Sequence, residues 1–287
     1  GVNIVADFLP ADNPIEKHIT FSAHYDSKTD IFDHEQRKPI YGFAPIAMGC
    51  LLAASMLGIV SSGRKWGPGA HRVCLALACV GVSGLVMLAL AFGGGLLVPA
   101  GRQSPGARDD ASAVAVLLAT ADQIAADHQQ LKRTAVRFVF FGGEEVNMQG
   151  SSAYSRSLAG SGEGFDRGVV VNCEFIGGEE PFCYWESSGT FLSKFRASDE
   201  AVQLYQDALT SLGLAPAISA GSIFDDTGRL LAAGFRAVTV GHADPVSSAG
   251  YHSQSDSARQ VVPAKLQETK SVFLRMITMT DRTAECL

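Results

Sequence analysis

The sequence predicts an α/β protein, a three-layer α/β/α sandwich with a central mixed, mostly parallel sheet, plus an inserted apolar helical hairpin. Strand-like runs alternate along the chain with segments of helical periodicity, an order typical of a largely parallel sheet that lies between helices. Hydrophobic residues make up 47% and charged residues 18% of the 287 residues, enough for the core of one large domain. Two long apolar segments interrupt the alternation and predict the hairpin.

Five segments have the composition of β-strands. Residues 18–24 alternate between polar and apolar side chains, and the predicted strand ends at His24. Residues 134–141 are almost continuously β-branched or aromatic, which indicates a central strand buried on both faces. The other predicted strands are residues 4–9, 168–173 and 236–240.

Four segments are predicted to be helical. In residues 109–127, apolar side chains recur at intervals of three and four residues. Residues 198–212 are amphipathic, and Gly213 follows them at a position that favours the end of a helix. A short helix is expected over residues 225–233, and Pro263 stands near the start of a final helix.

Residues 41–60 and 73–98 are apolar runs without a charged side chain, each long enough to cross a hydrocarbon core of roughly 30 Å. A polar, basic turn, residues 61–72, separates them. We predict a transmembrane hairpin over residues 41–98, inserted in a loop of the soluble domain. A hairpin buried in a soluble protein is the alternative. The basic turn favours a cytoplasmic tip, which would place the rest of this membrane-associated chain on the extracytoplasmic side.

The chain therefore divides into an α/β domain, residues 1–30 and 101–287, and the inserted hairpin, residues 39–100. Because the chain enters a strand-like run soon after Gly1, we expect this domain to be truncated at its N-terminus. The formal net charge is −6 and the sequence has no basic tract, which argues against a nucleic-acid partner. The six cysteines contain no C-x-x-C pair, so a zinc site built from thiolates is not expected.

Polar motifs follow the predicted strands or stand in nearby loops. Sites in open α/β sheets form beyond the carboxyl ends of the strands, so these motifs are the candidate functional residues. The motifs are His24-Tyr25-Asp26, Gly106 to Ser112, Glu144-Glu145, Asn172 to Gly177, and Tyr251-His252 with Asp256.

The first two motifs each have an ordinary explanation as well as a functional one. His24 can offer a neutral imidazole to a metal, and Asp26 could hold its other ring nitrogen, but such a spacing also arises by chance. Asp109 and Asp110 open the helix 109–127. An N-cap is the simple interpretation of such acids, although a carboxylate can also bridge two metal ions.

The pair Glu144-Glu145 is the most informative local signal. Two acids directly after an apolar strand repel each other and lose hydration, and a metal ion removes that conflict. One glutamate would then bind the metal, while the other would act as general base on water. Glu174 likewise ends an apolar strand, whereas His252 lies in a loop with Asp256 as its candidate partner. Together these residues supply the donors that two zinc ions prefer.

With these motifs the chain resembles the di-zinc aminopeptidase family of metallopeptidases, which includes bacterial leucyl aminopeptidases, glutamate carboxypeptidase and glutaminyl cyclase. The similarity extends from about residue 4 to the end of the chain, except for the apolar insertion. The resemblance implies that His24 and His252 bind one zinc ion, that Glu145 and Glu174 complete the second metal site, and that Asp109 bridges both ions.

The resemblance also implies roles outside the metal ligands. Glu144 would be the general base that takes a proton from water, with Asp26 as a second catalytic residue. The peptide between Asp109 and Asp110 would be cis, and Asp226 would lie in a loop near the site. The residues expected to contact substrate or to support the ligands are Asp110, Asp226, Tyr251 and Asp256.

These observations predict a membrane-anchored zinc exopeptidase, most simply an aminopeptidase that acts on the N-termini of peptides. Family aminopeptidases usually have aspartate where Glu174 stands, which leaves carboxypeptidase or dipeptidase activity open. A glutaminyl cyclase-like acyltransferase with one zinc ion is a second enzyme alternative, and a membrane-tethered scaffold is the non-enzyme alternative. The oligomeric state is not determined by the sequence.

Overall fold

The described residues form two compact units, which are considered separately. The first comprises Gly1–Ser27, Pro105–Pro245 and Asp256–Leu287, and the second comprises Lys28–Ser104 and Val246–Ser255. The second unit therefore contains the hairpin together with a loop from late in the sequence. This computed structural model describes residues 1–10, 14–32, 34–61, 67–99, 101–126, 131–159, 161–190, 192–242 and 250–283.

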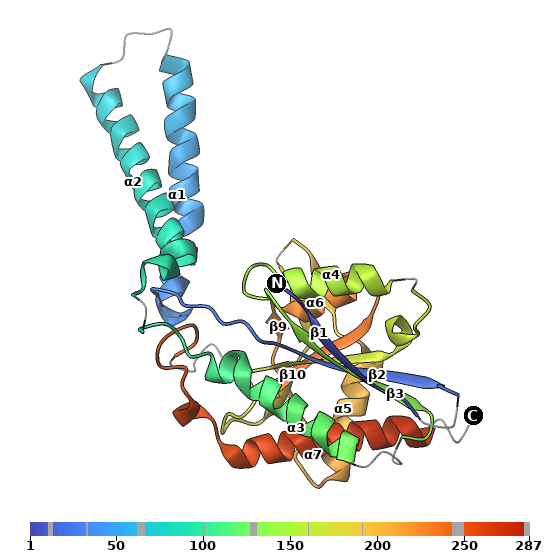
Figure 1. The fold of residues 1–287 in the computed structure, drawn as a ribbon. Coiled ribbons are helices and arrows are strands. Elements are labelled where there is room, and N and C mark those ends of the chain that lie inside the picture. Colours follow the sequence, from blue (N-terminus) through green and yellow to red (C-terminus); the bar gives the residue numbers. More distant parts are fainter. Residues whose placement is uncertain are drawn as a thin grey trace. The chain divides into compact units, whose positions relative to one another are not determined.

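A seven-stranded mixed sheet forms the centre of the first unit (Figure 1). Its strands are β1 (Ile4–Phe8), β2 (Lys17–His24), β3 (Thr134–Phe141), β4 (Val169–Glu174), β5 (Phe182–Trp185), β8 (Ile218–Ser219) and β10 (Arg236–His242), in the order β1-β3-β2-β4-β10-β5-β8. The four central strands are parallel, whereas β1 and β5 are antiparallel to their neighbours β3 and β10. A small second sheet contains β6 (Ser187–Gly189), β7 (Lys194–Arg196) and β9 (Ser222–Ile223).

Helices cover both faces of the large sheet and complete the predicted three layers (Figure 1). One face packs against α3 (Ser112–Ala126), α5 (Asp199–Ser211) and α7 (Pro263–Thr283). The other packs against α4 (Gln149–Leu158) and α6 (Asp226–Ala232). Short helical turns are η2 (Ala107–Ala111), η3 (Phe165–Arg167) and η4 (Ala258–Gln260).

Alternation along the strands produces two hydrophobic cores. Phe138 of β3 belongs to the core under α3, α5 and α7, whereas Val139 belongs to the core under α4 and α6. Every residue of β3 is buried, as the almost continuous apolar run predicts for a central strand. The sheet is therefore held from both sides, which makes the ends of its central strands rigid supports for polar side chains.

Several short elements have no counterpart among the predicted ones. Helix α4 is a short, serine-rich segment, and strands β5 to β9 span at most four residues each. Such segments are too short for a periodic pattern to develop, because helical or strand periodicity needs several repeats to be recognised.

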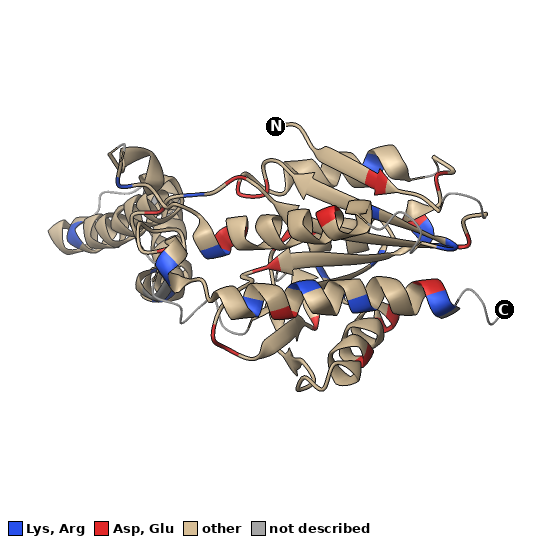
Figure 2. Ribbon diagram, turned by 60° about the horizontal axis from the view of Figure 1, so that its bottom comes forward, with Lys and Arg blue, Asp and Glu red and all other residues tan. Residues whose placement is uncertain are grey.

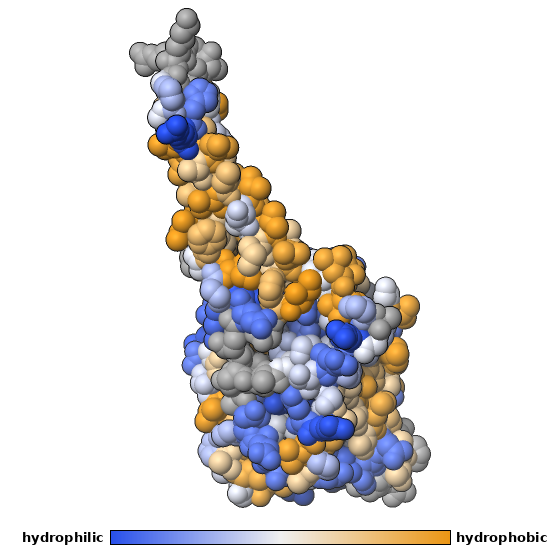
Figure 3. All heavy atoms as spheres, turned by 90° about the vertical axis from the view of Figure 1, so that its left-hand side faces the viewer, coloured by the Kyte–Doolittle hydropathy of each residue, from blue (hydrophilic) through white to orange (hydrophobic). Residues whose placement is uncertain are grey.

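The second unit contains the hairpin, made of α1 (His34–Ser61) and α2 (Pro68–Gly93) and followed by the turn η1 (Gly94–Leu97). Both helices are long and apolar enough to cross a membrane by length and composition. Their most apolar windows are only 6% and 11% buried, so these side chains point outward and are not a folded core (Figure 3). Figure 2 colours the charged side chains of the described residues. The sequence has no charged residue within residues 39–61 or 73–99. Arg64 and Lys65 of the predicted basic tip lie outside the described residues.

Glycines allow the two hairpin helices to approach closely. A Cβ atom on Gly84 would lie 2.2 Å from the Cβ atom of Ala47, and one on Gly81 would lie 2.3 Å from Cγ of Leu51. Small residues at such a helix contact let the backbones pack together in lipid as well as in water.

Asp281 of α7 fixes the start of β3. Its carboxylate, 6% exposed, accepts backbone N–H groups from Lys132 at 3.0 Å and from Arg133 and Thr134 at 2.9 Å. One side chain thus satisfies three donors at the entrance of a central strand.

We predict that Asp281→Ala destabilises the first unit, because the buried N–H groups lose their common acceptor. The expected cost is about 2 kcal/mol, and the apparent melting temperature should fall by roughly 4–8 °C. Tryptophan fluorescence during thermal unfolding measures this shift. Asp207→Ala, which removes an acid on the exposed side of α5, is the control and should change the midpoint little. Equal midpoints for both variants would contradict the role of Asp281.

Candidate metal centre

The parallel pairing of β2 and β4 brings two predicted ligands together. Ser22 pairs with Asn172, and His24 and Glu174 stand two residues further along the same strands, so both side chains point to one face. Nε2 of His24 lies 3.0 Å from Oδ1 of Asp109 and 3.6 Å from Oε2 of Glu174. Ligand atoms of these three buried residues all lie within 4.8 Å of one another, a spacing that suits one metal ion.

Asp109 reaches this group from the turn η2. Gly106, which precedes the turn, has a φ of 64°, and a Cβ atom there would lie 2.7 Å from Cβ of Ser27, so this position requires glycine. The peptide bond between Asp109 and Asp110 is cis, as the resemblance implies. The backbone N–H of His24 donates to Oδ2 of Asp110 at 3.3 Å.

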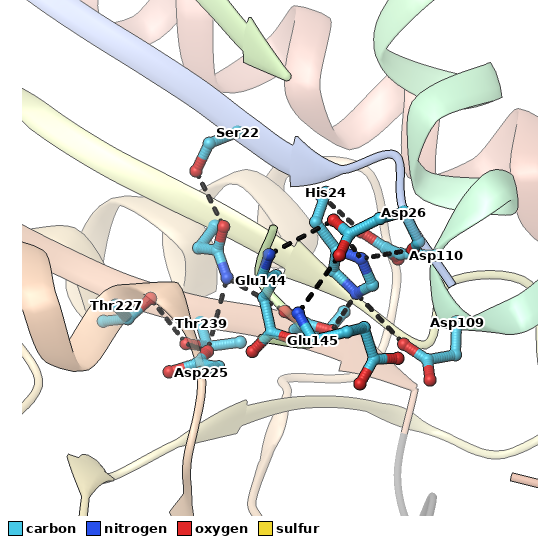
Figure 4. A network of polar contacts seen from close by, with 12 residues as sticks. Ser22, His24, Asp26, Asp109, Asp110, Glu144, Glu145, Asp225, Thr227 and Thr239 are labelled. Atoms are coloured by element: carbon cyan, nitrogen blue, oxygen red, sulfur yellow. Dashed lines mark hydrogen bonds and ion pairs between the residues drawn. The ribbon is translucent and has the colours of Figure 1, made fainter. Parts of the chain in front are cut away.

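The loop after β3 carries the paired glutamates and is organised by Asp26 (Figure 4). The carboxylate of Asp26 accepts backbone N–H groups from Gly143 at 2.9 Å and from Glu144 and Glu145 at 3.2 Å each. The same carboxylate lies 3.8 Å from Nδ1 of His24, so Asp26 also contacts the imidazole as the sequence predicts. The backbone carbonyl of Asp26 lies nearer, at 2.9 Å from that nitrogen. Three convergent N–H groups attract the carboxylate more strongly than one ring nitrogen.

The structure also corrects the predicted grouping of ligands. The resemblance places Glu174 with Glu145, but the geometry groups Glu174 with His24 because β2 and β4 are paired in register. Asp109 offers a ligand atom within 4.8 Å of one on Glu145 as well. Asp109 therefore lies within reach of both His24 and Glu145, the position that a bridging carboxylate needs.

Burial and mutual repulsion dominate the electrostatics of this cluster. Burial raises the pKa of Glu174 to about 8, and it also raises the pKa of Asp110 well above its usual range. Burial acts to lower the pKa of His24, but the carboxylates of Glu174 and Asp109 raise it well above its ordinary value. The cluster thus favours positive charge at its centre. A divalent cation supplies that charge and would displace the proton of His24, so the donor set fits zinc.

A row of buried polar residues behind the candidate ligands was not predicted. Asn172 accepts a hydrogen bond from Ser22 Oγ at 2.7 Å, and its amide donates to Glu174 Oε1 and Asp225 Oδ2 at 3.3 Å each (Figure 4). Asp225 also accepts from the hydroxyl group of Thr239. The two-residue period of a strand could have predicted these positions. Ser22 precedes His24 by two residues and Asn172 precedes Glu174 by two, so each pair shares one face of its strand.

Three further predicted residues belong to the first unit, and each lies in a different segment of the chain. Asp226 is fully buried at the start of α6, and burial raises its pKa to about 7. Glu144 is half-buried, and burial, followed by the charges of acids such as Glu174 and Asp226, raises its pKa well above the ordinary value. Asp256 holds the turn η2, since its carboxylate accepts the backbone N–H of Asp109 at 3.2 Å.

Tyr251 and His252 belong to the second unit, where their rings stack with centroids 3.7 Å apart. Nδ1 of His252 lies 2.5 Å from Oδ2 of Asp30. Asp30 is a partner of His252 that the sequence does not predict. The predicted support of His252 by Asp256 stays a prediction. The role of His252 as a metal ligand stays a prediction.

Comparison with known protein families identifies one that matches this chain. A model of peptidase family M28 matches residues 95–277, more than half of the chain. A comparison with curated protein sequences gives no significant match.

Solved structures of three enzymes share the fold. An aminopeptidase from Aneurinibacillus sp. strain AM-1 has 18% identity and a TM-score of 0.58, with 97% of this chain and 47% of that chain covered. A zinc aminopeptidase from Bacillus subtilis has 17% identity and a TM-score of 0.55, with 96% of this chain and 49% of that chain covered. A glutaminyl cyclase from an Acidobacteriales bacterium has 12% identity and a TM-score of 0.52, with 98% of this chain and 74% of that chain covered. The chain thus spans about half the length of the two aminopeptidases.

We predict that Asp26→Asn loosens the loop that carries Glu144 and Glu145, because a single amide oxygen cannot accept three N–H groups. Hydrogen exchange of the backbone amides of residues 143–145 should accelerate by about tenfold or more. Mass spectrometry of the peptides that cover this loop measures the change. Asp122→Asn, on the exposed side of α3, is the matched control. Unchanged protection in Asp26→Asn would show that other contacts hold the loop.

Proposed function

The chain belongs to peptidase family M28, and we propose that it is a zinc-dependent exopeptidase, most simply an aminopeptidase that removes residues from the N-termini of peptides. The observation that carries this proposal is the buried group of His24, Asp109 and Glu174, whose ligand atoms lie within 4.8 Å of one another. Buried carboxylates are stable when they are paired or bind a metal, and an imidazole with two carboxylates is a frequent set of zinc donors.

We assign the proposed ligands to two zinc ions. His24, Asp109 and Glu174 would hold the first, and Asp109 and Glu145 would hold the second. The resemblance implies that His252 is a ligand but groups it with His24, so its place on the second ion is our own assignment. Zinc supplies Lewis acidity toward the scissile carbonyl group and lowers the pKa of water that it binds.

Glu144 is the proposed general base. It stands in the loop after the strand β3, and its backbone N–H is held by the carboxylate of Asp26, as is that of Glu145 (Figure 4). It takes a proton from the attacking water and passes it to the nitrogen of the leaving amine. Asp26 acts through this loop as a positioning residue, because its contacts are with the backbone of residues 143–145.

The acids that are not proposed as ligands support recognition of a free amino terminus. Asp226 is completely buried at the start of α6, and its charge is among those that raise the pKa of Glu144 after burial itself, so these two acids act on each other. An α-ammonium group is attracted to such a surplus of carboxylates.

A glutaminyl cyclase-like reaction with a single zinc ion is the second candidate. The specific observation in its favour is the shared fold with a glutaminyl cyclase, of which the chain covers 74%. The two candidates differ in metal content and in product, because one hydrolyses a peptide bond and the other closes an N-terminal glutamine into a ring.

The function is tested by zinc content together with the turnover of aminoacyl-nitroanilides. We expect about two zinc ions per wild-type chain and no cleavage when the amino group is acetylated. Glu144→Gln should retain zinc but lose activity by about 10²- to 10⁴-fold, since it removes the base without removing a ligand. Glu179→Gln changes an exposed acid in the loop after the neighbouring strand β4 and should behave as wild type. One zinc ion and cyclisation of a peptide with N-terminal glutamine would favour the cyclase, and no bound zinc would overturn both enzyme proposals.

We also propose that α1 and α2 span a membrane and that the α/β unit lies on its extracytoplasmic side. The support is the length of the two helices, the absence of charge within residues 39–61 and 73–99, and the low burial of their apolar side chains. Exposed apolar surface of this extent is unfavourable in water.

Labelling of Cys79 tests the membrane span. Cys79 lies within α2 and is exposed in the folded hairpin, so a hydrophilic maleimide should modify it in water but not when lipid surrounds it. We predict that Cys79 is protected in native membranes by at least about tenfold relative to a cysteine at Arg102, an exposed residue beyond the hairpin. Peptide mapping after labelling gives the two rates. Equal labelling of Cys79 and Arg102→Cys in membranes would show that the hairpin lies in water.

A further inference from the structure

The base of the hairpin contains a buried ionic cluster that is centred on Asp30. This side chain is 6% exposed and forms an ion pair with Arg37, which stands near the start of α1 and is 5% exposed. The Nζ atom of Lys28 lies 3.7 Å from the same carboxylate oxygen, Oδ2. That oxygen also lies 2.5 Å from Nδ1 of His252. Asp30 therefore joins the first hairpin helix to the residue that is proposed as a zinc ligand.

Asp30 holds the backbone of His252 as well as its ring. The N–H of Asp30 donates to the carbonyl oxygen of His252 at 2.9 Å. His252 has a φ of 56°, a left-handed conformation that residues other than glycine adopt only where the surroundings stabilise it. The two bonds from Asp30 supply such a constraint, one on the backbone and one on the side chain.

The C-terminal end of the hairpin also contacts the segment that carries Asp30, residues 29–31. A Cβ atom on Gly95, in the turn η1 that follows α2, would lie 1.6 Å from the carbonyl oxygen of Thr29. A Cβ atom on Gly94 would lie 2.7 Å from Cδ1 of Ile31. The backbone N–H of Ser104 donates to Oγ1 of Thr29 at 2.9 Å. Residues 29–31 are thus held between the start of α1 and the chain that leaves α2.

We propose that the base of the hairpin, with Asp30 and Arg37, is a positioning device that orients His252 for zinc. This inference rests on the proposed function, in which His252 is a ligand. A carboxylate at Nδ1 fixes the ring so that Nδ1 carries the hydrogen and Nε2 presents its lone pair to the metal. Arg37 holds the carboxylate in place and balances its buried charge. The hairpin therefore supports the metal centre in addition to any anchoring role.

The first test compares zinc affinities of full-length variants by competition with a chelator. His252→Ala defines the loss expected when this ligand is absent. Asp30→Asn and Arg37→Ala should each weaken one of the two zinc ions by about 10- to 100-fold, the range typical of residues that orient a ligand. Arg37→Lys should recover part of that loss, because the positive charge is restored. Lys38→Ala, which removes the neighbouring exposed cation of α1, is the matched control and should bind zinc as wild type does.

The second test uses a pair of glycines at the end of the hairpin. Gly95→Ala forces residues 29–31 to move, because the new Cβ atom would overlap the carbonyl oxygen of Thr29. A Cβ atom on Gly93 would meet nothing within 4 Å. We expect Gly95→Ala, but not Gly93→Ala, to weaken the same zinc ion by about tenfold or more. The two variants change the same residue type two positions apart, so a general effect on the hairpin would appear in both.

The outcomes separate this inference from the proposed function. If wild type binds no zinc, or if His252→Ala keeps full zinc affinity, the proposed ligand set is wrong and the positioning role falls with it. If His252→Ala weakens zinc while Asp30→Asn and Gly95→Ala bind it as wild type does, only the positioning role is overturned. Circular dichroism of each variant, together with its melting temperature, identifies losses that come from unfolding.

Discussion

The gathering of buried carboxylates at the ends of β2, β3 and β4 is the constraint on which the rest of the first unit depends. Asp109, Asp110 and Glu174 are at most 4% exposed, and acids in such positions are stable only with compensating partners. The fold supplies these partners in three ways: the imidazole of His24, the N–H groups around Asp26 and Asp256, and the donor groups behind Glu174. A cation completes the compensation. The rigid sheet, packed by helices on both faces, prevents the acids from turning out into water.

The sequence predicts the members of this cluster because each follows an apolar strand or opens a helix. It does not predict which members share a metal, since that depends on the register between strands that are far apart in the chain. The pairing of Ser22 with Asn172 places His24 beside Glu174, and one step of slippage would turn one of the two side chains to the opposite face. Asn172 illustrates the same limit. Its position two residues before Glu174 indicates a shared face, but its bonds to Ser22 and Asp225 appear only in the folded sheet.

The fold itself is largely predictable, because the long strands and amphipathic helices have clear periods, whereas α4 and the strands β5 to β9 do not. The contact between His252 and Asp30 is missed from the sequence for a different reason. Asp256 is four residues away in the sequence, and proximity in the chain favours it, yet Asp30 makes the contact across 222 positions. Arg37 also gives no sequence signal, since a cation beside an apolar helix is the ordinary expectation at a membrane surface.

The hairpin is inserted in the sequence between two motifs of the proposed active site. The second unit begins at Lys28, two residues after Asp26, and the chain returns to the first unit at Pro105, four residues before Asp109. A peripheral anchor would tolerate a flexible linker on each side, because only the tether length matters. Here, by contrast, the ends of the hairpin are joined to residues 29–31 by a buried ion pair, by close glycine contacts and by a hydrogen bond from the backbone N–H of Ser104 to the hydroxyl group of Thr29. Both ends of the hairpin therefore hold Asp30, and Asp30 holds His252, so the second unit itself constrains the side chain that is proposed as a zinc ligand.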